Sequence, residues 1–241
     1  MVGALCYDED GGTYMKILIT NVLKKASYRD AFNRKIESVF NPLDIQSTTV
    51  YIENLNAIKG IDAYSHLIIS GSEASVLEEE PWYDALDTVL QSFAHANKPV
   101  LGICFGHQFI AKSYCGDLAV RKAQQPEFGW TDILLEKDAL FKDLKSFKSL
   151  VLHYDEVKEL DDRFEIIAQS RYCPIHGFKM KAKPIWGVQF HPDFLYADVA
   201  GILEHIEKTD PDFPQNHVKT FINEDIYAEN NKIFINFVNQ S

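Results

Sequence analysis

The sequence predicts an α/β protein with an open, mostly parallel sheet, helices on both faces, and a small antiparallel β element in its second half. In the first half, short β-branched apolar runs alternate with segments whose apolar residues recur at helical spacing. This alternation is typical of parallel sheets. In the second half, five strand-like runs follow one another with short turns between them. At 241 residues, the chain is long enough to bury a core of good size.

The first three elements are predicted to be a strand, a helix and a strand. Residues 16–20, KILIT, are short, apolar and β-branched, as in a buried strand. Residues 27–40 carry apolar side chains at helical spacing, and Ser27 is a candidate N-cap. Residues 47–52, STTVYI, favour a second strand.

Four further elements complete the first half. Residues 63–72, AYSHLIISGS, predict a strand that runs into a glycine–serine turn. Residues 81–97 predict a helix, with Pro81 at its start, where proline is tolerated. Residues 99–103, PVLGI, predict another short apolar strand, and the pattern of residues 105–116 is again helical.

The second half is predicted to be mostly strands, followed by helices near residues 195–207 and at the end of the chain. We find no internal repeat, low-complexity tract or linker, so we predict a single domain over residues 15–241 after a flexible extension, residues 1–14. The strand-like runs are GWTDILLE (129–136), SLVLHYDEV (149–157), RFEIIAQS (163–170), IHGFKM (175–180) and IWGVQF (185–190).

Composition argues against several classes of protein. The formal net charge of -11 repels phosphate backbones, so we expect no nucleic-acid partner. No apolar run approaches the ~18 residues of a membrane span. The four cysteines, Cys6, Cys104, Cys115 and Cys173, form no CxxC pair and no zinc pattern, so no metal site is predicted. Free thiols in a chain of this size favour a reducing compartment, which indicates the cytoplasm.

Residues 102–106, GICFG, have the form of a nucleophile elbow. A sharp strand-to-helix turn would force Cys104 into an unfavourable backbone conformation and crowd the residues on either side, where glycine avoids a clash. The first N–H groups and positive dipole end of the following helix would favour a thiolate. Taken alone, the pattern suits a buried structural cysteine equally well. Its place between a predicted strand and a predicted helix favours the nucleophile.

His191 is the best candidate partner among the eight histidines. It directly follows the strand-like run at 185–190, and open α/β sheets build their sites at strand ends. Asp193, two residues later, is placed to orient the imidazole and stabilise its charged form. Without Cys104, a turn histidine beside a solvated aspartate would be the simpler interpretation.

The combination of motifs resembles the class I glutamine amidotransferases, from about residue 16 to 238. GICFGHQ, followed about 85 residues later by GVQFHPD, is similar to their G-x-C-x-G-x-Q elbow and distal Gly-x-Gln-x-His-Pro-Glu. GWTDILLE after Glu127 resembles their E-x-G strand, and LHYDEV (152–157) resembles the His-x-Asp-x-Val segment of GMP-synthase glutaminases. ISGSEASV (69–76) stands where the family keeps its oxyanion loop, and stand-alone gamma-glutamyl peptidases, the nearer match, have a similar Gly-Ser turn. The implied fold is the flavodoxin-like fold of this family.

The resemblance implies a catalytic role for five residues. Cys104 would attack the side-chain amide of glutamine, which gives a thioester and releases ammonia. His191 would act as base and then as acid, with Asp193 orienting it. The backbone N–H groups of Gly71 and Phe105 would form the oxyanion hole.

The resemblance also implies how the substrate is bound. Gln108, one helical turn beyond the cysteine, would bind the glutamyl group. The segment His153, Tyr154 and Asp155 would close over the α-amino and carboxylate ends, largely through backbone groups. No cofactor is implied.

The sequence departs from the family pattern at three places. Asp193 stands where the family usually has Glu, which is one methylene longer. Ser72 and Glu73 replace the Gly-Pro-Gly of many members. The segment between Asp193 and the last helix is long, and its stretch KTDPDFPQNHV (208–218) is expected near the site or near a partner.

Three hypotheses about function follow. In the first, the chain is a glutaminase that supplies ammonia to a separate synthetase, because the sequence has no second domain and no GxxxxGK[ST] loop for a nucleotide. In the second, a stand-alone gamma-glutamyl peptidase or amidase uses the same cysteine, and water resolves the acyl-enzyme. The third is a non-catalytic binding protein, against which the complete set of cysteine, histidine and acid argues.

Overall fold

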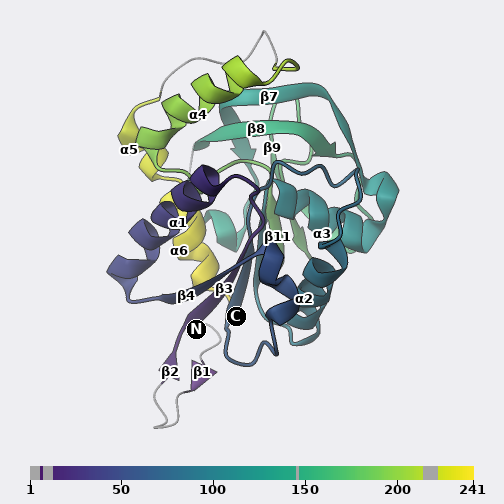
Figure 1. Ribbon diagram of the computed structural model, residues 1–241, viewed down its shortest axis with the longest axis vertical. Helices are drawn as coiled ribbons and strands as arrows, with labels where there is room; N and C mark the ends of the chain where they lie inside the picture. Colours follow the sequence, from purple (N-terminus) through teal and green to yellow (C-terminus); the bar gives the residue numbers. More distant parts are fainter. Residues whose placement is uncertain (1–5, 8–12, 145–146, 214–221) are drawn as a thin grey trace.

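The computed structural model describes residues 6–7, 13–144, 147–213 and 222–241. Figure 1 labels the elements in chain order. The strands are β1 (Cys6–Tyr7), β2 (Thr13–Tyr14), β3 (Lys16–Asn21), β4 (Gln46–Tyr51), β5 (His66–Ile69), β6 (Val100–Ile103), β7 (Val120–Leu135), β8 (Phe147–Val157), β9 (Phe164–Gln169), β10 (Gly177–Met180) and β11 (Ile185–Val188). The α-helices are α1 (Ala26–Phe40), α2 (Tyr83–His95), α3 (Phe105–Cys115), α4 (Tyr196–Thr209), α5 (Glu224–Ala228) and α6 (Asn231–Val238).

Within the described residues, the main sheet has nine strands in the order β4-β3-β5-β6-β11-β10-β9-β7-β8. The first five of these strands pair in parallel. The other four continue the same sheet with antiparallel pairing. The fold predicted from the sequence is therefore confirmed, and the antiparallel element is an extension of the parallel sheet.

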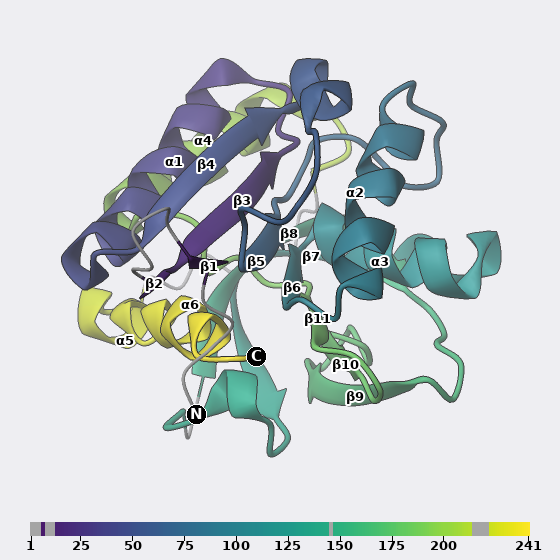
Figure 2. The same ribbon diagram turned by 90° about the horizontal axis from the view of Figure 1, so that it is seen from below.

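Helices cover both faces of the parallel strands, as Figure 2 shows, with α1 and α6 on one side and α2 and α3 on the other. Alternation along β3 explains this arrangement, since successive strand residues point to opposite faces. Ile17 and Ile19 belong to the core layer with α1 and α6, whereas Leu18 belongs to the layer with α2 and α3. Each of these side chains is fully buried, which stabilises the fold by about 1.5–3 kcal/mol per side chain.

The second half differs from expectation in three elements. β7 is much longer than the predicted run at 129–136, since it begins at Val120 and shifts register against β8 between Lys122 and Glu127. The tail contains two helices, α5 and α6, where the sequence predicted one. The strand at 185–190 ends two residues earlier, at Val188.

A third hydrophobic cluster joins the long segment after residue 193 to the antiparallel strands. Val199 and Ile202 of α4 pack with Trp130 of β7, Leu150 of β8 and Tyr227 of α5. This cluster holds α4 against the end of the sheet where β7 and β8 lie (Figure 1).

The predicted extension, residues 1–14, lies mostly outside the described residues. Its described parts, β1 and β2, pair with each other antiparallel. In the part of the chain that the structure describes, no helix is long and apolar enough to cross a membrane.

Candidate active site

Cys104 occupies the turn between β6 and α3 with a backbone conformation that non-glycine residues rarely adopt. Its φ is 50° and its ψ is -99°, a geometry that costs on the order of 1–3 kcal/mol. A Cβ on Gly102 would lie 2.4 Å from the carbonyl oxygen of Gly106, and a Cβ on Gly106 would lie 2.5 Å from the carbonyl oxygen of Ile69. The steric basis of the elbow predicted from the sequence is therefore confirmed.

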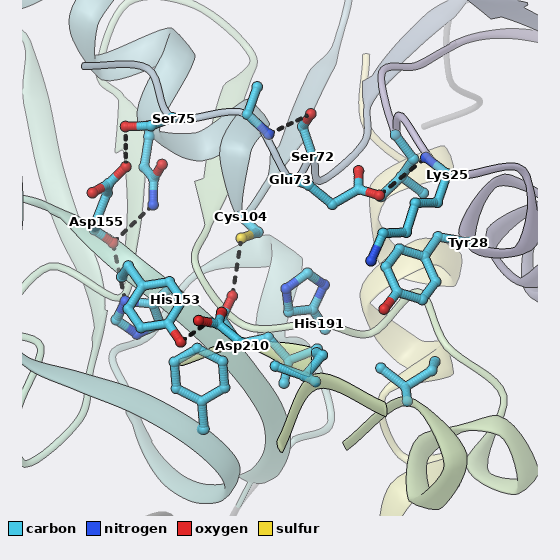
Figure 3. A pocket seen from close by; sticks show the side chains of 18 of the residues that line it. Lys25, Tyr28, Ser72, Glu73, Ser75, Cys104, His153, Asp155, His191 and Asp210 are labelled. Atoms are coloured by element: carbon cyan, nitrogen blue, oxygen red, sulfur yellow. Dashed lines mark hydrogen bonds between the residues drawn. The ribbon is translucent and has the colours of Figure 1, made fainter. Parts of the chain in front are cut away.

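The Cys104 thiol faces a pocket but is itself nearly buried, with 6% of the residue exposed. Its Sγ lies 3.7 Å from the carbonyl oxygen of Leu152. Gln189 Nε2 donates to Sγ from 3.5 Å. Gln189 lies in the GVQFHPD motif, yet sequence reasoning gave it no role of its own. Figure 3 shows Cys104 and His191 side by side at the pocket.

His191 and Asp193 form a buried pair beside the thiol. His191 Nδ1 lies 3.0 Å from Asp193 Oδ1, so the shorter acid reaches the ring. The other ring nitrogen, Nε2, has no hydrogen-bond partner among the described residues. A Cβ on Gly71 would lie 3.2 Å from His191 Cε1 and 3.7 Å from Cys104 Cβ. The backbone at Gly71 therefore meets both the thiol and the imidazole.

The charges around His191 favour its protonated form. Burial is the strongest influence on the pKa of His191 and lowers it. The charges of Cys104 and Asp193, together with their hydrogen bonds, outweigh burial and raise the pKa to about 10. The geometry therefore suits an imidazolium held between a thiolate and a carboxylate.

Two residues that sequence reasoning missed lie behind Asp193. Lys35 of α1 is buried, and burial lowers its pKa to about 8, although the charge of Asp193 opposes this shift. The Tyr227 hydroxyl of α5 donates to the backbone oxygens of Phe194 at 2.8 Å and His191 at 3.2 Å. Both residues lie far from residue 193 in the chain, in helices whose patterns indicate only packing.

The loop after β5 is fixed by the residues that depart from the family pattern. The Ser72 hydroxyl donates to the backbone oxygen of Val22 at 2.7 Å. The Glu73 carboxylate accepts from the backbone N–H groups of Lys24 at 2.8 Å and Lys25 at 3.0 Å. Ser72 and Glu73 thus anchor the loop that carries Gly71. The oxyanion-hole role of Gly71 and Phe105 stays a prediction.

Gln108 and Asp155 together build the wall of the pocket opposite this loop. Gln108 Nε2 donates to the backbone oxygen of Asp155 at 2.8 Å and to Gln189 Oε1 at 3.0 Å. The Asp155 carboxylate accepts from the Ser75 hydroxyl and pairs with Lys122 at 2.8 Å. The Gln108 amide therefore anchors this wall, and its contact with a substrate stays a prediction.

Tyr154 and His153 point to different sides of β8. The Tyr154 hydroxyl donates to Asp210 Oδ2 at 2.8 Å, which links β8 to the end of α4 (Figure 3). His153 is 3% exposed, and its Nε2 lies 3.3 Å from Glu127 Oε2. Its ring thus bonds to a buried acid, while its backbone belongs to the pocket wall.

The pocket has a volume of about 410 Å³. Six predicted site residues line it, and α4 contributes a wall that the sequence placed only as near the site or near a partner. Of the stretch 208–218, Thr209 and Asp210 line the pocket, and residues 214–218 lie outside the described residues. The six are Cys104, Gln108, His153, Tyr154, Asp155 and His191.

The chain is similar in sequence to one component of a glutamine-dependent enzyme. It is 37% identical over 149 residues to the glutamine-hydrolyzing GMP synthase subunit of Methanocaldococcus jannaschii, which is 61% of this chain and 71% of that subunit. It is 40% identical over 114 residues to the subunit of the same name from Pyrococcus abyssi, which is 46% of this chain and 60% of that subunit. The match thus spans less than two thirds of the Pyrococcus protein.

Solved structures share the fold. A glutamine amidotransferase from Thermotoga maritima superimposes with a TM-score of 0.72 at 16% identity, over 93% of this chain and 98% of that one. A protein from Thermoplasma acidophilum, described as a GMP synthase subunit, gives a TM-score of 0.67 at 24% identity, over 93% and 92%.

The sequence profile of the family described as "Glutamine amidotransferase class-I" matches residues 26–198. This range contains the elbow, the buried histidine–aspartate pair and the strands that bring them together. The chain therefore belongs to the class I glutamine amidotransferases.

Proposed function

We propose that this chain hydrolyses the side-chain amide of glutamine at Cys104 and passes the ammonia to a separate synthetase of the GMP synthase type. The observation that carries the proposal is the elbow thiol beside an imidazole whose Nδ1 faces Asp193 and whose Nε2 is free of other partners among the described residues. The relatives named as glutamine-hydrolyzing GMP synthase subunits support the choice of acceptor.

The geometry supports a two-step acyl transfer. The Cys104 thiolate attacks the amide carbon, and the negative charge on the carbonyl oxygen is stabilised by the N–H groups of Gly71 and Phe105. The His191 imidazolium gives its proton to the leaving nitrogen, so ammonia departs and a thioester remains. His191 then removes a proton from water, which attacks the thioester and releases glutamate and the thiolate. Asp193 holds the ring in one orientation throughout.

The size of the pocket favours a second candidate function, the stand-alone gamma-glutamyl peptidase or amidase. A volume of about 410 Å³ exceeds what a single amino acid needs and is in the range of pockets that hold drug-sized ligands. The α4 wall, with Ile202 and Ile206 on it, supplies apolar surface beyond the glutamyl group. A peptide leaving group would occupy this space.

A comparison of substrates distinguishes the two functions. Under the first proposal, we expect kcat/KM for glutamine to exceed that for gamma-glutamyl dipeptides by at least about 10-fold, and the rate to rise when a synthetase is added with its substrates. Ammonia is measured for glutamine, and the released amino acid for the dipeptides. The opposite preference would support the peptidase, and no turnover of either class would refute both.

The pH dependence of catalysis is expected to follow the protonation of His191. Because the pKa of His191 is raised to about 10, its proton is kept through neutral pH and is lost only as pH rises toward that value. Asp193→Asn removes one of the charges that raise this pKa. We therefore expect the alkaline fall of kcat/KM to move to lower pH, with a loss of roughly 10²-fold at neutral pH.

The profile is measured for both proteins over the same pH range, with stability checked at each pH. Asp198→Asn, an acid in the first turn of α4 outside the pocket, is the matched control and should leave the profile in place. An unchanged alkaline limb in Asp193→Asn would show that Asp193 does not act on His191.

A further inference from the structure

A second cluster of reactive side chains lies behind the wall of the pocket. It joins Glu127 of β7, His153 of β8, and Cys173 and His176 from the turn between β9 and β10. All four are buried, with exposed fractions of 4%, 3%, 0% and 0%. One donor atom from each lies within 4.8 Å of the other three. Glutamine hydrolysis as derived above uses none of these side chains.

The distances inside the cluster fit ligands of a shared ion. Glu127 Oε2 lies 3.3 Å from His153 Nε2 and 3.2 Å from His176 Nε2. A charge-assisted hydrogen bond would be about 2.7–2.9 Å long. Two ligands at about 2.0–2.1 Å from a tetrahedral zinc ion are roughly 3.3–3.4 Å apart. The spacing therefore matches an edge of a coordination tetrahedron better than a charged hydrogen bond.

The hydrogen bond on the far side of the His153 ring points the same way. His153 Nδ1 lies 3.0 Å from the backbone oxygen of Asp155, which only accepts, so Nδ1 carries the hydrogen. In the neutral ring, Nε2 then presents a lone pair to Glu127 Oε2, which is also an acceptor. Two acceptors face each other stably only with a proton or a cation between them. The backbone contact at Nδ1 is the kind that orients a metal-binding histidine.

The remaining groups leave room for a cation and not only for a proton. Glu127 also accepts from the Ser170 hydroxyl at 2.8 and 2.9 Å, an outer contact that fixes the carboxylate. His176 Nδ1 is buried without a hydrogen-bond partner in the described residues, so this ring is incompletely satisfied by the protein. A single proton between Glu127 and His153 would leave His176 and Cys173 unused.

The charges also balance around a divalent ion. Burial, the strongest influence on Glu127, opposes ionisation, but the hydrogen bonds from His153 and His176 outweigh it and lower the pKa to about 2. Burial raises the pKa of the Cys173 thiol, so a proton must leave Cys173 when a metal binds. One carboxylate, one thiolate and two neutral imidazoles then neutralise a charge of +2.

We propose that Glu127, His153, Cys173 and His176 bind one zinc ion with tetrahedral geometry. Binding displaces the thiol proton of Cys173 and any proton that Glu127 shares with His153, and both go to solvent. Four protein ligands and full burial make the site structural, since a catalytic zinc keeps an open position. The ion would fix β7 and β8 to the turn before β10. It would thereby hold the backbone of residues 153–155 at the pocket wall, whatever substrate the pocket takes.

Zinc content of the full chain tests the proposal directly. The protein is stripped with a chelator, dialysed against zinc, freed of loose metal and analysed by mass spectrometry. We expect one tightly bound zinc per chain, a melting temperature that falls with chelator and recovers with zinc, and zinc affinity on the order of 100-fold weaker in Cys173→Ser and His176→Ala. Cys115→Ser and His95→Ala are the controls, because these residues lie outside the cluster.

Cobalt substitution separates this cluster from the other cysteine–histidine pair. A cobalt–thiolate charge-transfer band should persist in Cys104→Ser and vanish in Cys173→Ser. The band would instead vanish in Cys104→Ser if the metal bound at the elbow, and this would overturn the proposal. The proposal also fails if the stripped protein takes up no zinc and its melting temperature ignores both zinc and chelator, a test that needs no variant to fold.

Discussion

Cys104→Ala is expected to lower the rate of glutamine hydrolysis by on the order of 10⁴-fold or more. The substitution removes the sulfur placed to attack the amide, and alanine offers no nucleophile in its place. The lost contacts of Sγ, at 3.5 and 3.7 Å, are weak. The fold should therefore keep its melting temperature while catalysis is lost.

Ammonia and glutamate release from glutamine measure this effect, with circular dichroism as the check on folding. Cys115→Ala provides the matched control, because Cys115 lies at the other end of α3 and outside the pocket. It should keep nearly full activity. A Cys104→Ala protein that retains a tenth of wild-type activity would refute the nucleophile assignment.

Gly102→Ala is expected to disrupt the elbow and the fold around it. The added Cβ would lie 2.4 Å from the carbonyl oxygen and 2.5 Å from the carbonyl carbon of Gly106, and 2.6 Å from Ile110 Cδ1. The first two atoms belong to backbone and cannot move without shifting the start of α3. We expect a loss of about 3 kcal/mol in the free energy of unfolding. Activity should fall as well, because Cys104 moves with the turn.

Denaturant unfolding and the glutaminase assay test this expectation. Gly201→Ala is the control, since it adds the same methyl group within α4, where no described atom lies within 4 Å of the new Cβ. There the change should stabilise the protein by roughly 0.5–1 kcal/mol through helix propensity. Equal stability of the two variants would mean that the elbow yields to a side chain, contrary to the geometry.

The fold was predictable wherever local pattern and burial coincide. The runs at 16–20 and 99–103 are mostly apolar because their strands are covered on both faces, and both appear in the structure as β3 and β6. The start of β7 was not predictable, because residues 120–126 alternate between buried, partly buried and exposed positions and include Pro126. Its pairing with β8 supplies what the local sequence lacks.

The site divides in the same way between local and distant signals. Cys104 lies in a motif whose glycines have a steric reason, and His191 and Asp193 are two residues apart at a strand end. Gln189 and Lys35 gave no such signal. They reach the site through the packing of β11 and α1, which pattern alone does not specify. The proposed zinc ligands are likewise scattered over three segments, so no spacing could suggest them.

The strand β8 contacts the site through its main chain. Three of its carbonyl oxygens take part: Leu150 O accepts from the backbone N–H of His191 at 2.8 Å, Leu152 O from Cys104 Sγ at 3.7 Å, and Asp155 O from Gln108 Nε2 at 2.8 Å.

Every amino acid carries this acceptor, so evolution can exchange the residues at 150 and 152 without losing these contacts. Leu150 is held to apolar types by the core, and Leu152 has more freedom at the edge of the pocket. A comparison of relatives would thus show ordinary drift at two positions that touch the proposed base and nucleophile. Part of the catalytic architecture is inherited as backbone shape and leaves no record in residue identity.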